Sequence, residues 1–155
     1  MADPRSGLDP RWLRHAAGDR IEVRGGWLSF LATGEQTGGA YVLVETANNP
    51  STAVPSHIHE REDETWFALE GEYVFEVGGQ VFCAHAGDYV FGPRNVAHSY
   101  ANRSANVARA LIMVTPAGFE GFWRESARLA GDTAAHEALG RKYGVRFAPA
   151  LKNAT

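Results

Sequence analysis

A two-residue alternation of apolar and polar side chains runs through most of the chain and constrains the fold more than any other feature. Between residues 20 and 115 the alternating stretches are short, and glycine-containing turns separate them. Alternation places successive side chains on opposite faces of a strand. The pair Gly78-Gly79 predicts a tight hairpin, because such turns need positive φ. About ten short strands without intervening helices favour an all-β sandwich or barrel.

The two flanks of this region follow other patterns. Residues 1–19 are polar and mixed, which predicts an N-terminal arm, and residues 20–115 form the expected β-domain. In residues 116–155 the apolar side chains recur at helical spacing, which predicts a C-terminal segment of two short helices packing on the β-domain. The second helix should begin after Asp132 as N-cap and end at Gly144. A chain of 155 residues fits one such domain.

Composition excludes several function classes. The net charge of −3 leaves no basic excess for a nucleic-acid partner or an anionic membrane surface. No stretch approaches the roughly 20 apolar residues that span a bilayer, so a cytoplasmic location is expected. The only cysteine, Cys83, excludes an intramolecular disulfide and a cysteine-rich zinc site, and its apolar neighbours suggest a small buried filler. No flavin or nicotinamide motif occurs, so no organic cofactor is expected.

Four side chains carry the candidate chemistry. His57 and His59 are two residues apart on an alternating stretch, so their imidazoles should share one face of a strand. Glu64 begins the next strand after a short turn, and His98 follows downstream. Three imidazoles and one carboxylate suit one divalent transition metal (Fe, Mn, Ni, Co, Cu or Zn) and suit Mg or Ca poorly. The ligand set does not identify the metal.

By these residues the chain resembles the cupin superfamily. The first cupin motif, G-x5-H-x-H-x3,4-E-x6-G, is matched by His57, His59, Glu64 and Gly71, and the second, G-x5-P-x-G-x2-H-x3-N, by Gly87, Pro93, His98 and Asn102. Ser51 replaces the leading glycine of the first motif, and Asn95 replaces the middle glycine of the second. Asparagine readily adopts the left-handed conformation, so Asn95 can still form the turn before His98.

Three longer sequence segments resemble a particular group within this superfamily. HIHEREDETWFALEGE, TPAGFEGFWRE and KYGVRF are similar to bacterial single-domain cupins like quercetin 2,3-dioxygenase. This resemblance implies a jelly-roll β-barrel that holds the metal and pairs into a homodimer. It also implies a dioxygenase that uses O2 on a small hydroxylated aromatic substrate, flavonol- or polyketide-like.

Residue roles follow from the spacing. Glu64 is the candidate general base as well as a metal ligand. Trp66 and Tyr100 lie two residues from Glu64 and His98, so they should face the same cavity. Three further aromatics are expected to close one mouth of the barrel as pocket residues: Phe119, Phe122 and Trp123. The alternative for each aromatic is a plain core position.

Two charged features receive simpler interpretations. The run from Glu60 to Asp63 is interpreted as a solvated loop, and Arg109 as the partner of a neighbouring glutamate.

Two other functions compete with the oxygenase. The same metal could stabilise an enolate in a non-redox cyclase, isomerase or decarboxylase. The domain could also bind or store a small molecule without turnover. Oxygen uptake separates the first alternative from the oxygenase, and tight binding without product marks the second.

Overall fold

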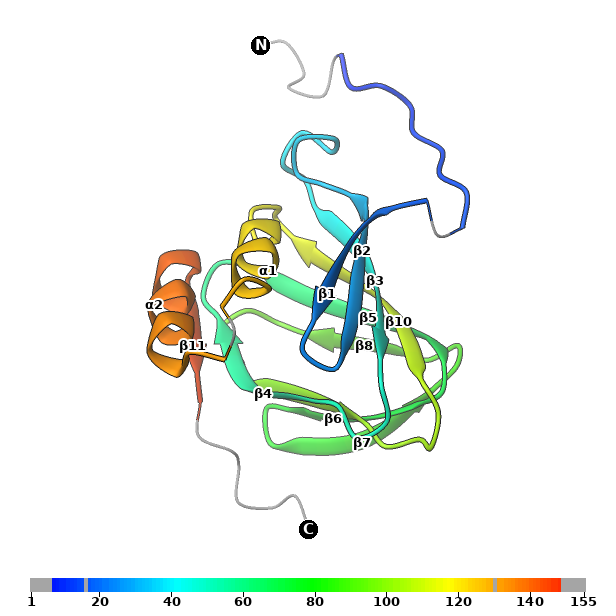
Figure 1. Cartoon of the computed structure of the whole chain (residues 1–155), viewed down its shortest axis with the longest axis vertical. Coiled ribbons are helices and arrows are strands. Elements are labelled where there is room, and N and C mark those ends of the chain that lie inside the picture. The colour runs from blue at the N-terminus through cyan, green and yellow to red at the C-terminus, as the bar shows by residue number, and fades with distance from the viewer. Residues whose placement is uncertain (1–6, 16, 130, 149–155) are drawn as a thin grey trace.

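Two antiparallel sheets packed face to face make up the body of the protein in the computed structural model, which describes residues 7–15, 17–129 and 131–148. The six-stranded sheet has the order β1-β2-β3-β10-β5-β8, and the five-stranded sheet the order β11-β4-β9-β6-β7 (Figure 1). The strands are β1 (Asp19–Val23), β2 (Gly26–Ala32), β3 (Val42–Asn48), β4 (Ala53–His59), β5 (Asp63–Glu70), β6 (Glu72–Val77), β7 (Gln80–His85), β8 (Tyr89–Gly92), β9 (His98–Asn102), β10 (Ala108–Thr115) and β11 (Val145–Phe147).

This is the expected all-β jelly roll, and it takes the form of a sandwich. Within the described residues the two sheets are not joined by hydrogen bonds into one closed barrel. The Gly78-Gly79 hairpin joins β6 to β7 as predicted, and both glycines have positive φ. Ser51 and Asn95, the two departures from the cupin glycines, both adopt φ of 64°. The backbone therefore keeps the left-handed conformation that glycine favours at both positions.

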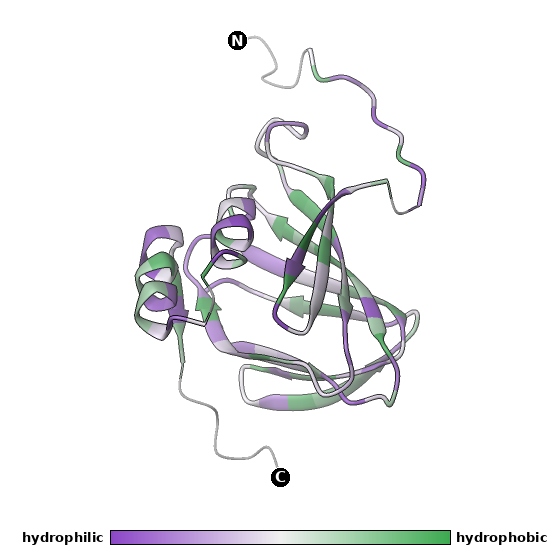
Figure 2. Cartoon of the chain, viewed as in Figure 1, coloured by the Kyte–Doolittle hydropathy of each residue, from purple (hydrophilic) through white to green (hydrophobic). Residues whose placement is uncertain are grey.

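The alternation along the strands produces the core. Strand β10 shows this most clearly, because every second residue from Ala108 to Val114 is buried while those between are half-buried. Figure 2 shows apolar colouring along most of β10 and hydrophilic colouring over the first part of β5, where Asp63 and Glu64 lie. Each fully buried large apolar side chain contributes on the order of 1.5–3 kcal/mol to stability. Burying a polar cluster inside such a core costs free energy unless its members are paired or hold an ion.

Two helices follow the sandwich, as the helical spacing predicts. They are α1 (Glu120–Ser126) and α2 (Thr133–Tyr143). Asp132 caps α2 by accepting a hydrogen bond from the Ala135 amide, and Gly144 ends the helix with φ of 71°. Among the described residues no helix is long and apolar enough to cross a membrane.

Strand β11 was not expected from the sequence. It pairs with β4, with Val145 opposite His59 and Phe147 opposite His57. The strand that carries two of the candidate ligands is therefore covered on its outer edge by the segment after α2 (Figure 1).

Candidate metal centre

The four candidate ligands come together between the two sheets. His57 and His59 lie on β4, and His98 lies directly opposite His57 on β9. Glu64 reaches them from β5 in the other sheet. All four are buried, with exposed fractions between 1% and 8%. One nitrogen or oxygen atom from each lies within 4.8 Å of those of the other three.

In all three histidines the nitrogen that faces Glu64 is Nε2. The Nε2 atoms of His59, His98 and His57 lie 3.0, 3.1 and 3.9 Å from Oε2 of Glu64. The opposite nitrogens face other acceptors. Nδ1 of His57 lies 2.8 Å from the Pro55 carbonyl oxygen and Nδ1 of His98 lies 3.1 Å from that of Val96. Because carbonyl oxygens only accept, these contacts place a proton on Nδ1 of His57 and of His98, and Nε2 is the nitrogen that faces Glu64.

The pKa values of the clustered residues are shifted in different directions. Burial lowers the pKa of His57. Burial would also lower the pKa of His59, but the carboxylates of Glu62 and Glu64 outweigh it and raise this pKa to about 9. Burial would raise the pKa of Glu64, but the neighbouring imidazoles of His57, His59 and His98 hold it well below its ordinary value. At neutral pH the carboxylate is therefore charged, and a cation entering the cluster displaces a proton from His59.

The donor set fits a transition metal on structural grounds. Nε2 of His59 is buried and lies 3.0 Å from Oε2 of Glu64, but within the described residues no contact of this nitrogen has hydrogen-bond geometry. Buried polar atoms nearly always have a partner, so this nitrogen is suited to bind an ion. Three imidazole nitrogens and one carboxylate oxygen match Fe, Mn, Co, Ni, Cu or Zn. His57, His59, Glu64 and His98 could therefore hold one such ion.

Aromatic rings surround the cluster in two layers. The Trp66 ring centroid lies 5.2 Å from that of His98, and Phe119 meets His59 edge-on at 4.4 Å. Tyr100 packs against Trp66 at 5.9 Å, and burial raises its pKa well above the ordinary value. The remaining two predicted pocket residues lie behind Phe119: the Phe122 ring stacks on it at 4.9 Å, and that of Trp123 meets it at 5.0 Å. The first layer thus consists of Trp66 and Phe119.

Glu62 was missed by the sequence analysis. The interpretation of residues 60–63 as a solvated loop is wrong at this position, because Glu62 is only 5% exposed. Its Oε2 lies 3.4 Å from Nδ1 of His59. The burial depends on contacts made by residues distant in sequence, so the run of acidic residues gave no signal of it.

Cys83 also differs from expectation. Its side chain is exposed, and its neighbour Ala84 on the same strand is buried, so Cys83 lies on the face of β7 that is turned away from the core. The prediction of a buried filler is therefore wrong.

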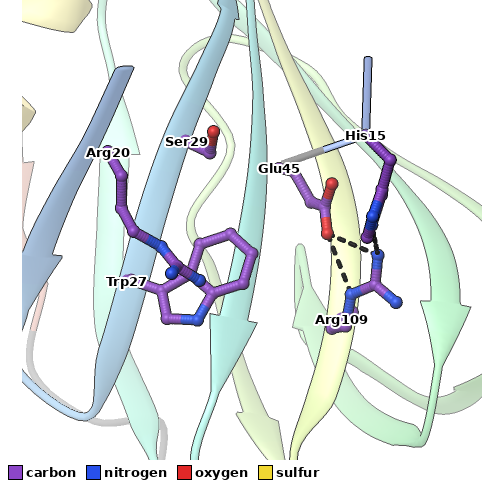
Figure 3. Close-up of a pocket in the computed structure, with 6 residues that line it drawn as sticks. All are labelled: His15, Arg20, Trp27, Ser29, Glu45 and Arg109. Atoms are coloured by element: carbon purple, nitrogen blue, oxygen red, sulfur yellow. Dashed lines mark hydrogen bonds and ion pairs between the residues drawn. The ribbon is translucent and has the colours of Figure 1, made fainter. Parts of the chain in front are cut away.

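A separate hollow of about 250 Å³ lies on the outer face of the six-stranded sheet. Figure 3 shows Arg20 over the ring of Trp27 on one side and Arg109 between Glu45 and His15 on the other. Arg109 donates to Oε1 of Glu45 at 2.6 and 2.8 Å. The expected glutamate partner of Arg109 is thus present, and the hollow shares no lining residue with the histidine cluster.

Comparison with known proteins gives the family. Residues 46–114 match the family model described as "Cupin domain", and this stretch contains all four residues of the cluster. The chain therefore carries a cupin domain over these residues. Among curated proteins, the quercetin 2,3-dioxygenase of Bacillus subtilis (strain 168) is 27% identical over 118 residues, which cover 76% of this chain. The chain spans only 35% of the length of that relative.

Solved structures agree on the fold. KdgF from Halomonas sp. superposes with a TM-score of 0.65 at 16% identity, covering 73% of this chain and 99% of KdgF. The polyketide cyclase RemF from Streptomyces resistomycificus gives a TM-score of 0.59 at 22% identity, covering 69% of this chain and 80% of RemF. At these identities the likeness concerns the fold, because one fold hosts many activities.

Proposed function

We propose that this protein binds one divalent transition metal through His57, His59, Glu64 and His98 and acts with O2 on a hydroxylated aromatic substrate. The observation that carries the proposal is the convergence of three Nε2 atoms on one carboxylate oxygen inside an aromatic-lined core. The curated relative that is named a quercetin 2,3-dioxygenase supports the choice of reaction class.

The metal, when bound, supplies Lewis acidity towards a phenolic or enolic oxygen of the substrate and electronic coupling to O2. Glu64 accepts the substrate proton. Its described contacts all involve Oε2, and no hydrogen bond to Oε1 is found within the described residues. Oε1 is therefore the oxygen that takes the proton, while Oε2 stays directed at the three histidines.

The aromatic rings hold the substrate and exclude water. Trp66 contacts His98 and Phe119 contacts His59, so both rings are placed to contact a flat substrate held next to Glu64. The Nε1–H group of Trp66 is buried and, among the described residues, has no hydrogen-bond acceptor. Since a buried donor without a partner is costly, this group is suited to donate to an oxygen of the substrate.

Metal analysis of the purified protein, followed by an oxygen-electrode screen with flavonols and polycyclic phenols, tests the proposal. We expect close to one metal ion per chain and O2 uptake that ceases after chelation. Product formation without O2 uptake would favour a metal-dependent cyclase, isomerase or decarboxylase. Tight ligand binding without product would favour a binding protein.

We also propose that the protein is a homodimer, as the family resemblance implies. Tyr89 and Phe91 on the edge strand β8 are 64% and 49% exposed, and Phe67 lies beside Tyr89 on β5. Exposed apolar side chains at a sheet edge favour pairing with another chain. Sedimentation at micromolar concentration should give a dimer, and a monomer would contradict this proposal.

A further inference from the structure

A second carboxylate lies behind His59, on the side opposite Glu64. Glu62 is 5% exposed, and its Oε2 lies 3.4 Å from Nδ1 of His59. Within the described residues this is the only hydrogen bond of the Glu62 carboxylate. A buried charge needs such a partner, so the burial of Glu62 depends on His59.

The loop between β4 and β5 is fixed so that Glu62 points inward. Before the loop, the backbone carbonyl of His59 accepts a hydrogen bond from the Asn95 amide at 2.7 Å. After the loop, the Asp63 carboxylate accepts three hydrogen bonds from Arg94, through its amide, Nε and Nη2. Glu60 is directed outward to Arg146. Glu62 is thus the one acid of this loop that faces the histidine cluster.

His59 differs from the other two histidines in the charge of its Nδ1 partner. His57 and His98 both face neutral backbone carbonyl oxygens. His59 faces a carboxylate, which fixes the ring and makes the opposite nitrogen a stronger electron-pair donor. The ring is further held between Phe119, edge-on at 4.4 Å, and the stacked ring of His98 at 5.5 Å.

We propose that Glu62 is a positioning residue for the metal centre. It accepts the Nδ1–H hydrogen bond of His59, keeps Nε2 directed towards the ion, and strengthens His59 as a ligand through its negative charge. This inference rests on the metal site of the proposed function, but it does not depend on the substrate or on O2.

Titration of metal-free protein with Co²⁺ tests the inference, with the visible absorption of the bound ion as the signal. Glu62→Ala removes both the hydrogen bond and the charge, and loss of such a supporting partner weakens metal binding by roughly 10- to 100-fold. Glu62→Gln keeps an oxygen that can accept the bond, so it should lose less affinity. Both variants should shift the Co²⁺ spectrum, because the donor strength of His59 changes.

Glu60→Gln is the matched control. It makes the same chemical change in the same loop, at a side chain that is 43% exposed and paired with Arg146. We expect wild-type affinity and spectrum. Thermal unfolding of all metal-free variants shows whether each is folded, and if Glu62→Ala does not fold, Glu62→Gln alone decides.

Three results would overturn the inference. The first is wild-type Co²⁺ affinity and spectrum in the folded Glu62 variants, even if their unfolding temperature falls, because Glu62 would then serve folding only. The second is an equal loss of affinity in Glu60→Gln. The third is a wild-type protein that binds no Co²⁺, which would also overturn the proposed metal site. Absence of O2 uptake with intact Co²⁺ binding would instead count against the oxygenase reaction alone.

Discussion

Two buried carboxylates on opposite faces of the same sheet have very different partners. Glu45, 7% exposed on the outer face, is paired with the guanidinium of Arg109 at 2.6 Å. Glu64, 4% exposed on the inner face, is paired within the described residues with imidazoles alone. Arginine stays charged at all physiological pH values, whereas an imidazole binds either a proton or a metal through the same nitrogen.

This difference distinguishes a carboxylate that stabilises the fold from one that can take part in a reaction. The charge of Glu45 is balanced permanently, and the hydrogen bond to Glu45 raises the pKa of Arg109 further. The charge of Glu64 is balanced by imidazoles, and these can exchange a bound proton for a metal ion. Both residues are acidic positions on strands, so burial alone would not distinguish them. The two carboxylates are distinguished by their partners, which are arginine for Glu45 and histidines for Glu64.

The largest expected effect is loss of the metal from the imidazole cluster. His98→Ala removes one of four ligands, and its affinity should fall by more than the roughly 10- to 100-fold that loss of a supporting residue costs. Arg109→Ala, which removes the partner of Glu45, should keep the wild-type metal content. Elemental analysis after dialysis measures both, and full occupancy in His98→Ala would contradict the site.

The next largest effect is expected when Glu64 and Glu45 are each replaced by glutamine. Glu64→Gln keeps the size and one oxygen but removes the basicity, so kcat should fall on the order of 10²–10⁴ while much of the metal remains. Glu45→Gln should retain kcat and lose about 1–3 kcal/mol of unfolding free energy, because Arg109 loses a charged partner. Turnover, metal content and denaturant unfolding are measured on the same preparations. A near-normal kcat of Glu64→Gln at full metal loading would exclude the base role.

A smaller effect concerns the aromatic wall next to the cluster. Phe119→Leu removes the ring that meets His59 edge-on, and aromatic contacts of this kind contribute about 0.5–1.5 kcal/mol. We expect KM to rise by up to about tenfold, with metal content unchanged. Phe122→Leu, one layer further from the histidines, is the control and should change KM less. Equal KM changes in the two variants would argue against a pocket role for Phe119.

The smallest effect is a pH dependence of stability at Asp63. Hydrogen bonds from Arg94 lower the pKa of Asp63 below its ordinary value of 3.8. A lowered pKa in the folded state contributes stability above the ordinary pKa, and this contribution is lost as pH falls through the folded-state value. The pair is partly exposed, so the gain is small. Unfolding temperatures of wild type and Asp63→Asn should differ slightly at neutral pH and converge in acid, and a constant difference would contradict the assignment.

The sequence predicts the parts of this protein that depend on local pattern. Alternation predicts the strands because each strand buries one face, and motif spacing selects four residues that the fold brings within 4.8 Å. The direction of Glu62 is not local, since it depends on Arg94 holding Asp63 from a loop 31 residues away. Strand β11 has three residues, too few to show a periodicity. The exposure of Cys83 depends on which face of β7 is turned away from the core, and this follows from the packing of the two sheets.

The pairing of β11 with β4 has a consequence for the order in which the nascent chain can assemble. Strand β4, with two of the histidines, leaves the ribosome long before β11 is translated. Until then its outer edge offers free backbone N–H and C=O groups, and such an edge invites pairing with other unfinished chains. When β11 arrives, it occupies this edge, and the amide of Glu60 gains the carbonyl of Gly144 as acceptor. The histidine strand therefore keeps a free outer edge until the segment after α2 has been made and has paired with it.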